Sequence, residues 1–259
     1  MRDAGDERTS GYAPITAGLL PLSAIGIGVV RGGKALLRDV SLKVGAGAPT
    51  VIRGPNGAGK SLLLRVLHGL VEPTSGSVNW GDGVSAEVAG RRSALVFQRP
   101  TLLRRSAIAN IEFVLAHRPR AKLRQSAAAI LEQSGLAEFA GVPARHLSGG
   151  QQQRLAMARA MAACPEVLFL DEPAASLDPA STAAVERMIG EAVTGGTKVV
   201  LVTHDAGQAR RLAGEVVFLD RGRVAEVTAA GEFFGGPRSA AARAYLAGEL
   251  YLPEVAGGP

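Results

Sequence analysis

The sequence predicts an α/β protein with a mixed or parallel sheet as its core, an antiparallel β subdomain and a helical insertion. Residues 49–53 are β-prone and lead through a glycine-rich loop into apolar residues at helical spacing over 62–70. Two later apolar runs, 167–170 and 198–203, end in polar side chains, as strands covered on both faces do. Between residues 106 and 163 helical spacing replaces the β pattern, which predicts the insertion.

The composition limits the classes of protein to which this chain can belong. A length of 259 residues with 47% hydrophobic residues is enough for one or two domains with a sizeable core. The single cysteine, Cys164, excludes a disulfide framework or a Cys-pair zinc site within one chain, and we expect it to be a small buried residue. The net charge of +6 suits phosphates or an anionic surface, but only 4% of residues are aromatic, so we expect no nucleic-acid partner.

The N-terminal segment resembles a membrane span in length only. Residues 12–30 carry no charge, but Pro14, Pro21 and a β-prone end favour a loose extension that leads into a first strand. Residues 1–10 mix acidic and basic side chains, unlike the positive start of a signal peptide. We therefore expect residues 1–21 to be an N-terminal extension.

Short β runs on either side of the glycine-rich loop predict the remaining strands. Residues 22–30 and 35–44 flank the turn Arg31-Gly32-Gly33-Lys34, which indicates a hairpin, and 77–80 is a further strand. Residues 94–97 suit a buried parallel strand that ends at Gln98.

The C-terminal third continues the α/β alternation. We expect a helix over residues 180–193, a strand pair at 215–219 and 224–227, and a helical tail over 233–252.

The glycine-rich loop fits the pattern G-x-x-x-x-G-K-[ST] of a phosphate-binding loop. Its place between a strand and a helix separates it from an ordinary glycine-rich turn. Backbone N–H groups and the helix N-terminus are expected to hold β- and γ-phosphates, with Lys60 reaching the phosphates and Ser61 binding Mg²⁺. The loop consists of Gly54, Pro55, Asn56, Gly57, Ala58, Gly59, Lys60 and Ser61.

Polar residues at the ends of apolar runs point to the same sheet edge. Asp171 is placed to hold Mg²⁺ and Glu172 to act as general base, although a strand that merely ends in two acidic turn residues has the same pattern. Gln98 is expected to contact Mg²⁺ or the attacking water, and His204 the γ-phosphate, whereas a purely structural role is the alternative for each.

A second helix start has anion-binding features. Ser148 is a good N-cap, and two glycines after it leave backbone N–H groups open ahead of a long helix. An ordinary capped helix is the alternative, but it does not require the five-residue string Leu147-Ser148-Gly149-Gly150-Gln151.

From about residue 22 to 227 the chain resembles the ATP-binding cassette subunit of ABC transporters. Residues 54–61 match Walker A, Gln98 the Q-loop, 147–151 the signature, 167–172 the Walker B strand with its catalytic glutamate, and His204 the H-loop. The string Ser176-Leu177-Asp178 matches the D-loop. These motifs stand in the order found in that family.

The resemblance implies an ABC ATPase fold of the P-loop NTPase class and three structural parts. The ATPase domain would span residues 22–228, with a helical subdomain at 99–165 inserted in its core and a helical tail at 229–259. It also implies ATP hydrolysis with ATP and Mg²⁺ as cofactors. Catalytic roles would fall to Glu172, His204 and Gln98, and metal binding to Ser61, Gln98 and Asp171. ATP would be held by residues 54–61 and, from a second copy, by Ser148, Gly149, Gly150, Gln151 and Asp178.

One position departs from the family. Relatives stack an aromatic side chain on adenine where this chain has Arg31. A guanidinium can also stack on a base, so Arg31 is the expected adenine contact.

The resemblance further implies a head-to-tail homodimer with ATP held between the copies, working with a separate transmembrane permease. The protein would lie in the cytoplasm, on the inner face of the cell membrane, with a solute-binding protein as an indirect partner. Leu102 and Leu103 are expected to be exposed anchors for the permease, or else to pack within the helical subdomain.

Three segments resemble importers of oxyanions of the tungstate/molybdate type, with phosphate importers as neighbours. They are Leu67-His68-Gly69-Leu70, Leu102-Leu103-Arg104-Arg105-Ser106 and Gln208-Ala209-Arg210-Arg211-Leu212. Two alternatives stay open: a soluble ABC ATPase of the iron–sulfur assembly type, and an export ATPase with a separate membrane subunit. DNA-repair relatives carry long coiled coils or zinc-binding cysteine pairs, neither of which occurs here.

Overall fold

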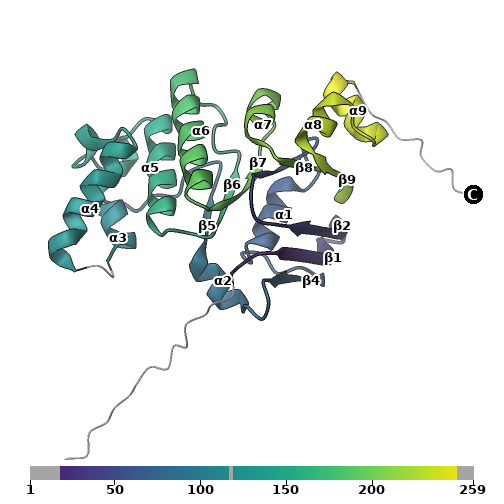
Figure 1. Cartoon of the computed structure of the whole chain (residues 1–259), viewed down its shortest axis with the longest axis horizontal. Coiled ribbons are helices and arrows are strands. Elements are labelled where there is room, and N and C mark those ends of the chain that lie inside the picture. The colour runs from purple at the N-terminus through teal and green to yellow at the C-terminus, as the bar shows by residue number, and fades with distance from the viewer. Residues whose placement is uncertain (1–17, 117–118, 250–259) are drawn as a thin grey trace, which may run out of the picture.

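The computed structural model describes residues 18–116 and 119–249, which form two sheets and the helices that cover them (Figure 1). One sheet has three strands, and the other has six. The predicted fold class, an α/β core with an antiparallel subdomain and a helical insertion, is confirmed.

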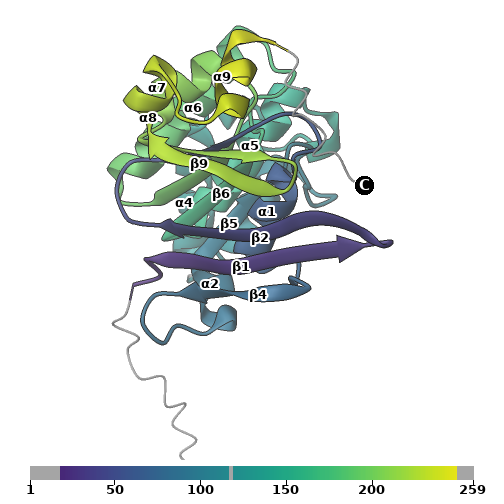
Figure 2. The same ribbon diagram turned by 90° about the vertical axis from the view of Figure 1, so that its right-hand side faces the viewer.

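The three-stranded sheet is antiparallel. Its central strand β1 (Leu22–Arg31) pairs with β2 (Lys34–Val44) on one side and β4 (Ser75–Trp80) on the other. Figure 2 shows these three strands as one layer, apart from the helices of the C-terminal third. Leu22, Ala24 and Ile27 of β1 are buried in the core that this sheet shares with α1 (Lys60–Leu67).

The six-stranded sheet is parallel except at one edge. Five strands run in one direction and lie in the order β5 (Ser93–Val96), β6 (Val167–Asp171), β7 (Lys198–Val202), β3 (Thr50–Arg53) and β8 (Glu215–Asp220). At the edge, β9 (Arg223–Ala229) pairs with β8 in the opposite direction. Every residue of β6 and β7 is buried, which explains their uninterrupted apolar runs. The chain therefore leaves β3, β5, β6 and β7 at a common edge.

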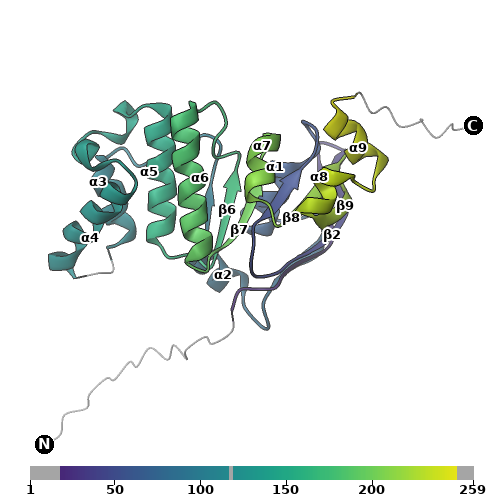
Figure 3. The same ribbon diagram turned by 45° about the horizontal axis from the view of Figure 1, so that its top comes forward.

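Helices cover both faces of this sheet. Helix α1 (Lys60–Leu67) lies in the core between the two sheets. On the other face, α3 (Ala107–Val114), α4 (Arg120–Gln133), α5 (Gly149–Ala162) and α6 (Pro179–Thr194) contribute to a second core. Figure 3 shows α3 and α4 at one end of the molecule and the C-terminal helices at the other.

Trp80 joins the two layers. It is 4% exposed, and its ring meets that of Phe169 edge to face with centroids 6.0 Å apart. Within residues 18–116 and 119–249, none of the helices combines the length and apolar character that a bilayer crossing requires.

Two local expectations need correction, and one helix has no counterpart among the predictions. The tail forms two helices, α8 (Ala230–Gly235) and α9 (Ala240–Ala247), because Pro237 interrupts the apolar spacing, and the predicted end at residue 252 lies outside the described residues. Cys164 is exposed in the turn after α5, with a φ of 51°, so its predicted burial is wrong. Helix α2 (Ala86–Arg92), capped by Ser85, was not anticipated.

The remaining elements are α7 (Ala206–Leu212) and two short 3-10 turns at Ala137–Phe139 and Ala144–His146. Of the predicted N-terminal extension, residues 1–17 lie outside the described part of the chain.

Candidate nucleotide site

The loop between β3 and α1 is shaped to bind an anion. Gly54, Gly57 and Gly59 have φ values of 146°, 79° and 101°, which favour glycine. At Gly54 a Cβ would overlap the carbonyl oxygen of Leu219, so a larger residue cannot stand there without displacing β8. Gly59 is the N-cap of α1 and provides no side-chain hydrogen bond, which leaves the first N–H groups of the helix open to a ligand.

Lys60 is held against this loop. It is 6% exposed, and its Nζ donates to the carbonyl oxygens of Gly54 at 2.8 Å and Pro55 at 3.0 Å. Burial lowers the pKa of Lys60, while the nearby carboxylates of Glu172 and Asp171 act in the opposite direction. The buried ammonium is therefore positioned to neutralise a phosphate that enters the loop.

Ser61 and Asp171 present two oxygen ligands side by side. Ser61 Oγ donates to Asp171 Oδ1 at 2.7 Å, and Arg65 lies 3.6 Å from the other carboxylate oxygen. Burial raises the pKa of Asp171, against the opposing effects of the Ser61 hydrogen bond and Arg65. No group of three or more His, Cys, Asp or Glu that suits a metal occurs in the part of the chain described here. A hydroxyl and a carboxylate are oxygen ligands of the kind that Mg²⁺ prefers, so Ser61 and Asp171 would fit this ion.

The three predicted catalytic residues meet at one carboxylate. Nδ1 of His204 lies 3.0 Å and Nε2 of Gln98 lies 3.3 Å from Oε2 of Glu172. The strand order β5-β6-β7 brings them together, because each follows the end of one of three neighbouring parallel strands. The sequence placed Gln98 near the metal or water and His204 near the γ-phosphate, and in this structure both contact Glu172.

Glu172 also faces the phosphate loop. A cavity with a volume of about 440 Å³ is lined by Leu36, Asn56, Gly57, Gly59, Lys60, Ser61, Leu62 and Glu172. Glu172 has a φ of 48°, in the left-handed region that is costly for residues other than glycine. This bend at the end of β6 places Asp171 against Ser61 and Glu172 on the wall of the cavity that Ser61 also lines.

The second helix start is satisfied by its own side chains. Ser148 Oγ accepts from Gln151 N at 3.3 Å and Gln151 Oε1 accepts from Ser148 N at 2.8 Å, which is a capping box. A Cβ on Gly150 would overlap Ser181 Oγ, so this glycine allows α5 to pack against the start of α6. Asp178 caps α6 by accepting from Ser181 N at 3.0 Å. Among the described residues, no hydrogen bond links residues 148–151 to the phosphate loop.

Three residues expected at the surface differ in their exposure. Arg31 is exposed at the end of β1, and its contact with adenine stays a prediction. Leu102 and Leu103 are half-buried. Leu102 packs against the core, so it fits the alternative of packing within the helical subdomain and not the role of an exposed anchor. Phe113 on α3 is 58% exposed, and among the described residues of this subdomain it is the large apolar side chain that faces solvent.

Arg53 lies beside His204, although it is not among the residues that the sequence predicts for the site. This residue ends β3, is 2% exposed, and donates to the carbonyl oxygen of His204 at 3.0 Å. A charged residue at the last position of an otherwise apolar run, next to the phosphate loop, was the signal available in the sequence.

Comparison with known proteins finds the same combination of elements elsewhere. A family model described as ABC transporter matches residues 37–175. The methionine import ATP-binding protein MetN of Caulobacter vibrioides is 41% identical over 227 residues, which are 83% of this chain and 68% of the relative. The phosphate import ATP-binding protein PstB 2 of Natronomonas pharaonis is 36% identical over 247 residues, or 88% and 87% of the two chains.

A third relative is a tungstate uptake system ATP-binding protein of Peptoclostridium acidaminophilum. It is 39% identical over 198 residues, which cover 75% of this chain and 92% of the relative. Among solved structures, a dimeric ATP-binding cassette in a post-hydrolysis state with ADP and Pi superposes with a TM-score of 0.72. That structure is 27% identical and covers 81% of this chain and 98% of its own.

Proposed function

Because this chain belongs to the ABC transporter family of ATP-binding proteins, we propose that its ATPase activity powers solute import through a separate membrane permease. The observation that carries the proposal is the position of Glu172, whose carboxylate is contacted by His204 and Gln98 and faces the phosphate loop.

In the proposed reaction, Glu172 takes a proton from the water that attacks the γ-phosphate. His204 and Gln98 hold this carboxylate in place, and Lys60 with the N–H groups at the start of α1 binds the phosphates. Ser61, Asp171 and Gln98 would hold Mg²⁺. When bound, Mg²⁺ supplies positive charge to the β- and γ-phosphate oxygens.

The proposed working unit is a head-to-tail homodimer. In it, Ser148, Gly149, Gly150, Gln151 and Asp178 of one copy close over the ATP on the phosphate loop of the other. The exposed position of Ser148 supports this, as does the dimeric state of the ADP- and Pi-bound relative. Loss of the γ-phosphate charge would then remove the attraction that holds the two helix starts together.

The permease would hold the protein at the inner, cytoplasmic face of the cell membrane, with a solute-binding protein delivering cargo from the other side. The exposed ring of Phe113 on α3 offers an apolar contact for the permease. Among cargo classes we propose an oxyanion such as tungstate or molybdate. The tungstate and phosphate importers support this class, and the similarly related methionine importer favours a different one.

Two measurements test the proposal. Full-length protein carrying a purification tag should co-purify with a membrane permease, and cells in which Lys60→Ala replaces the native chain should lose molybdate or tungstate uptake. Retention of iron–sulfur assembly proteins without a membrane subunit would support the soluble alternative. A rise in cellular oxyanion in the Lys60→Ala cells would support export, and unchanged uptake with loss of methionine uptake would move the cargo to amino acids.

A further inference from the structure

A buried arginine lies behind the catalytic cluster. Arg53 Nη2 donates to the carbonyl oxygen of His204 at 3.0 Å and to Tyr245 Oη at 3.2 Å, and its Nη1 lies 3.5 Å from the carbonyl oxygen of Asp205. Within the described residues, no salt bridge joins Arg53 to a carboxylate, and its buried Nε has no hydrogen-bond partner. Burying a cation that no carboxylate neutralises costs free energy, so a role in stability alone explains the burial of Arg53 poorly.

The C-terminal helices complete the surroundings of this guanidinium. Its carbon atom lies 5.3 Å from the ring centre of Tyr245 on α9 and 5.9 Å from that of Phe234 on α8. Both distances are in the range for cation–π attraction, which partly replaces the missing anion. Arg53 therefore links the tail of the chain to the strand that leads into the phosphate loop.

The same guanidinium holds the backbone of His204. The side chain of His204 is 58% exposed, so packing around the ring does little to orient it. Its orientation depends on the backbone, whose carbonyl oxygen Arg53 fixes, and on the contact of Nδ1 with Glu172 at 3.0 Å. A continuous series of contacts thus runs from Tyr245 through Arg53 and His204 to Glu172.

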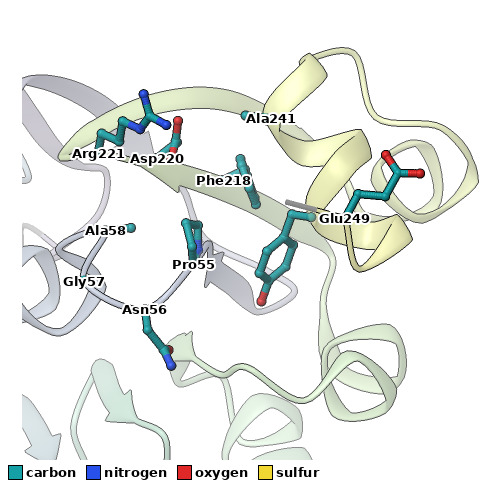
Figure 4. A pocket seen from close by; sticks show the side chains of 10 residues that line it. Pro55, Asn56, Gly57, Ala58, Phe218, Asp220, Arg221, Ala241 and Glu249 are labelled. Carbon is teal, nitrogen blue, oxygen red and sulfur yellow. The ribbon is translucent and has the colours of Figure 1, made fainter. Parts of the chain in front are cut away.

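A cavity of about 340 Å³ separates the phosphate loop from α9 (Figure 4). Pro55 and Asn56 lie on one side of it, and Ala241 and Glu249 on the other. Tyr245 also lines this cavity, yet its hydroxyl reaches Arg53. The tail therefore reaches the catalytic edge through a hydrogen bond to Arg53, although it stands apart from the loop at this cavity.

We propose that Arg53 and Tyr245 are positioning residues that fix the backbone of His204, so that α8 and α9 help to set the rate of ATP hydrolysis. This inference rests on the proposed roles of His204 and Glu172. If Arg53 and Tyr245 contributed to stability alone, their substitution would lower the melting temperature and leave kcat per folded molecule unchanged.

The experiment compares ATPase kinetics of Arg53→Met, Arg53→Lys and Tyr245→Phe with the parent protein. We expect Arg53→Met to lower kcat about tenfold with KM for ATP nearly unchanged, because a displaced catalytic group slows the step it serves. Arg53→Lys keeps the charge but lacks the forked donors, so it should recover part of the rate. Tyr245→Phe, which keeps the ring, should lower kcat about two- to threefold.

Two matched controls separate this effect from general loosening of the tail. Arg210→Met removes the other guanidinium that lies over Phe234, at 5.2 Å, and should leave kcat unchanged. Ser239→Ala removes the hydroxyl that caps α9 by accepting from Ala242 N. It should lower the melting temperature and leave kcat unchanged.

The deciding measurement is a double-mutant cycle with His204→Ala. If Arg53 acts through His204, then adding Arg53→Met to His204→Ala causes no further loss of kcat. An equal loss in both backgrounds overturns the proposal. If Arg53→Met does not fold, then Tyr245→Phe enters the same cycle, and an unchanged kcat in Tyr245→Phe overturns it.

The cycle also separates this inference from the proposed site. If His204→Ala and Glu172→Gln both keep the parent kcat, then the proposed site fails and this inference fails with it. If they lose activity while Arg53→Met and Tyr245→Phe do not, then only the positioning role is wrong.

Discussion

The starts of α1 and α5 are both suited to bind an anion, but their N-caps differ. At α1 the N-cap is Gly59, which contributes no side-chain hydrogen bond, and Lys60, Ser61 and Glu172 line the same cavity. At α5 the capping box of Ser148 and Gln151 already satisfies two N–H groups, and Ser148 is exposed. One helix start is open to a ligand, whereas the other is stable without one.

From this difference we expect the two helix starts to act at different steps. In the proposed function, the α1 start binds phosphate within a single copy, because its donors and charges are already gathered there. In the proposed dimer, the α5 start would have to offer the Gly149 and Gly150 N–H groups, or exchange its own cap, when a second copy brings a phosphate to it. Closure of the proposed dimer is then a separate event that ATP promotes by binding the closed state better.

The strongest test of the α1 side is Glu172→Gln. We expect kcat to fall at least about 100-fold, because the amide cannot accept the proton of the attacking water. ATP binding should persist, and ATP should trap a dimer that size-exclusion chromatography detects. Unchanged hydrolysis would disprove the general-base role.

The α5 side is tested by mixing subunits. Ser148→Arg places a bulky cation at the start of α5, so homodimers of this variant should be inactive. A mixture with Lys60→Ala should regain at most one working site per dimer, measured as ATPase activity against the mixing ratio. Full activity of Ser148→Arg alone would show that the α5 start does not contribute.

A stability test uses the two neighbouring glycines of α5. Gly150→Ala introduces a Cβ that overlaps Ser181 Oγ, and overpacking of this kind costs about 1–3 kcal/mol of unfolding free energy. Gly149→Ala is the matched control, since nothing lies within 4 Å of its Cβ. Denaturant midpoints should separate the two variants, and Ser181→Gly should relieve the Gly150→Ala defect. Equal midpoints would mean that α5 does not depend on this contact with α6.

The smallest expected effect is a pH dependence at the cap of α6. Hydrogen bonds from the hydroxyl and backbone N–H of Ser181 hold the pKa of Asp178 below its usual value. A lowered carboxylate pKa contributes stability above the unfolded pKa of about 4, and this contribution is lost as the pH falls through the folded value. Melting temperatures between about pH 2.5 and 5 should therefore fall less steeply in Asp178→Asn than in the parent. Identical slopes would contradict this.

Local chemistry made much of the site predictable. The loop 54–61 was visible because glycines and a lysine stand between a strand and a helix, and Ser148 because small polar residues cap helices. Asp171 was visible because a central strand reads as four apolar residues followed by a charge.

Features that depend on packing between distant segments were not predictable in the same way. The contacts of Gln98 and His204 with Glu172 follow from the order of three strands, which a linear sequence does not state. The role of Gly150 depends on Ser181 of another helix. In the sequence Arg53 is an ordinary residue at the end of a strand, and only the fold shows that Tyr245 lies beside it. The single tail helix was a local error, since apolar spacing was extended across Pro237.

The contact between Trp80 and Phe169 gives the protein an optical probe of its own. Trp80 is the only tryptophan in the chain, and Phe169 lies two residues before Asp171 on β6. Because indole emission shifts with the polarity around the ring, unlabelled protein should fluoresce with one well-defined maximum. A change in that maximum upon addition of ATP would report movement between the two sheets.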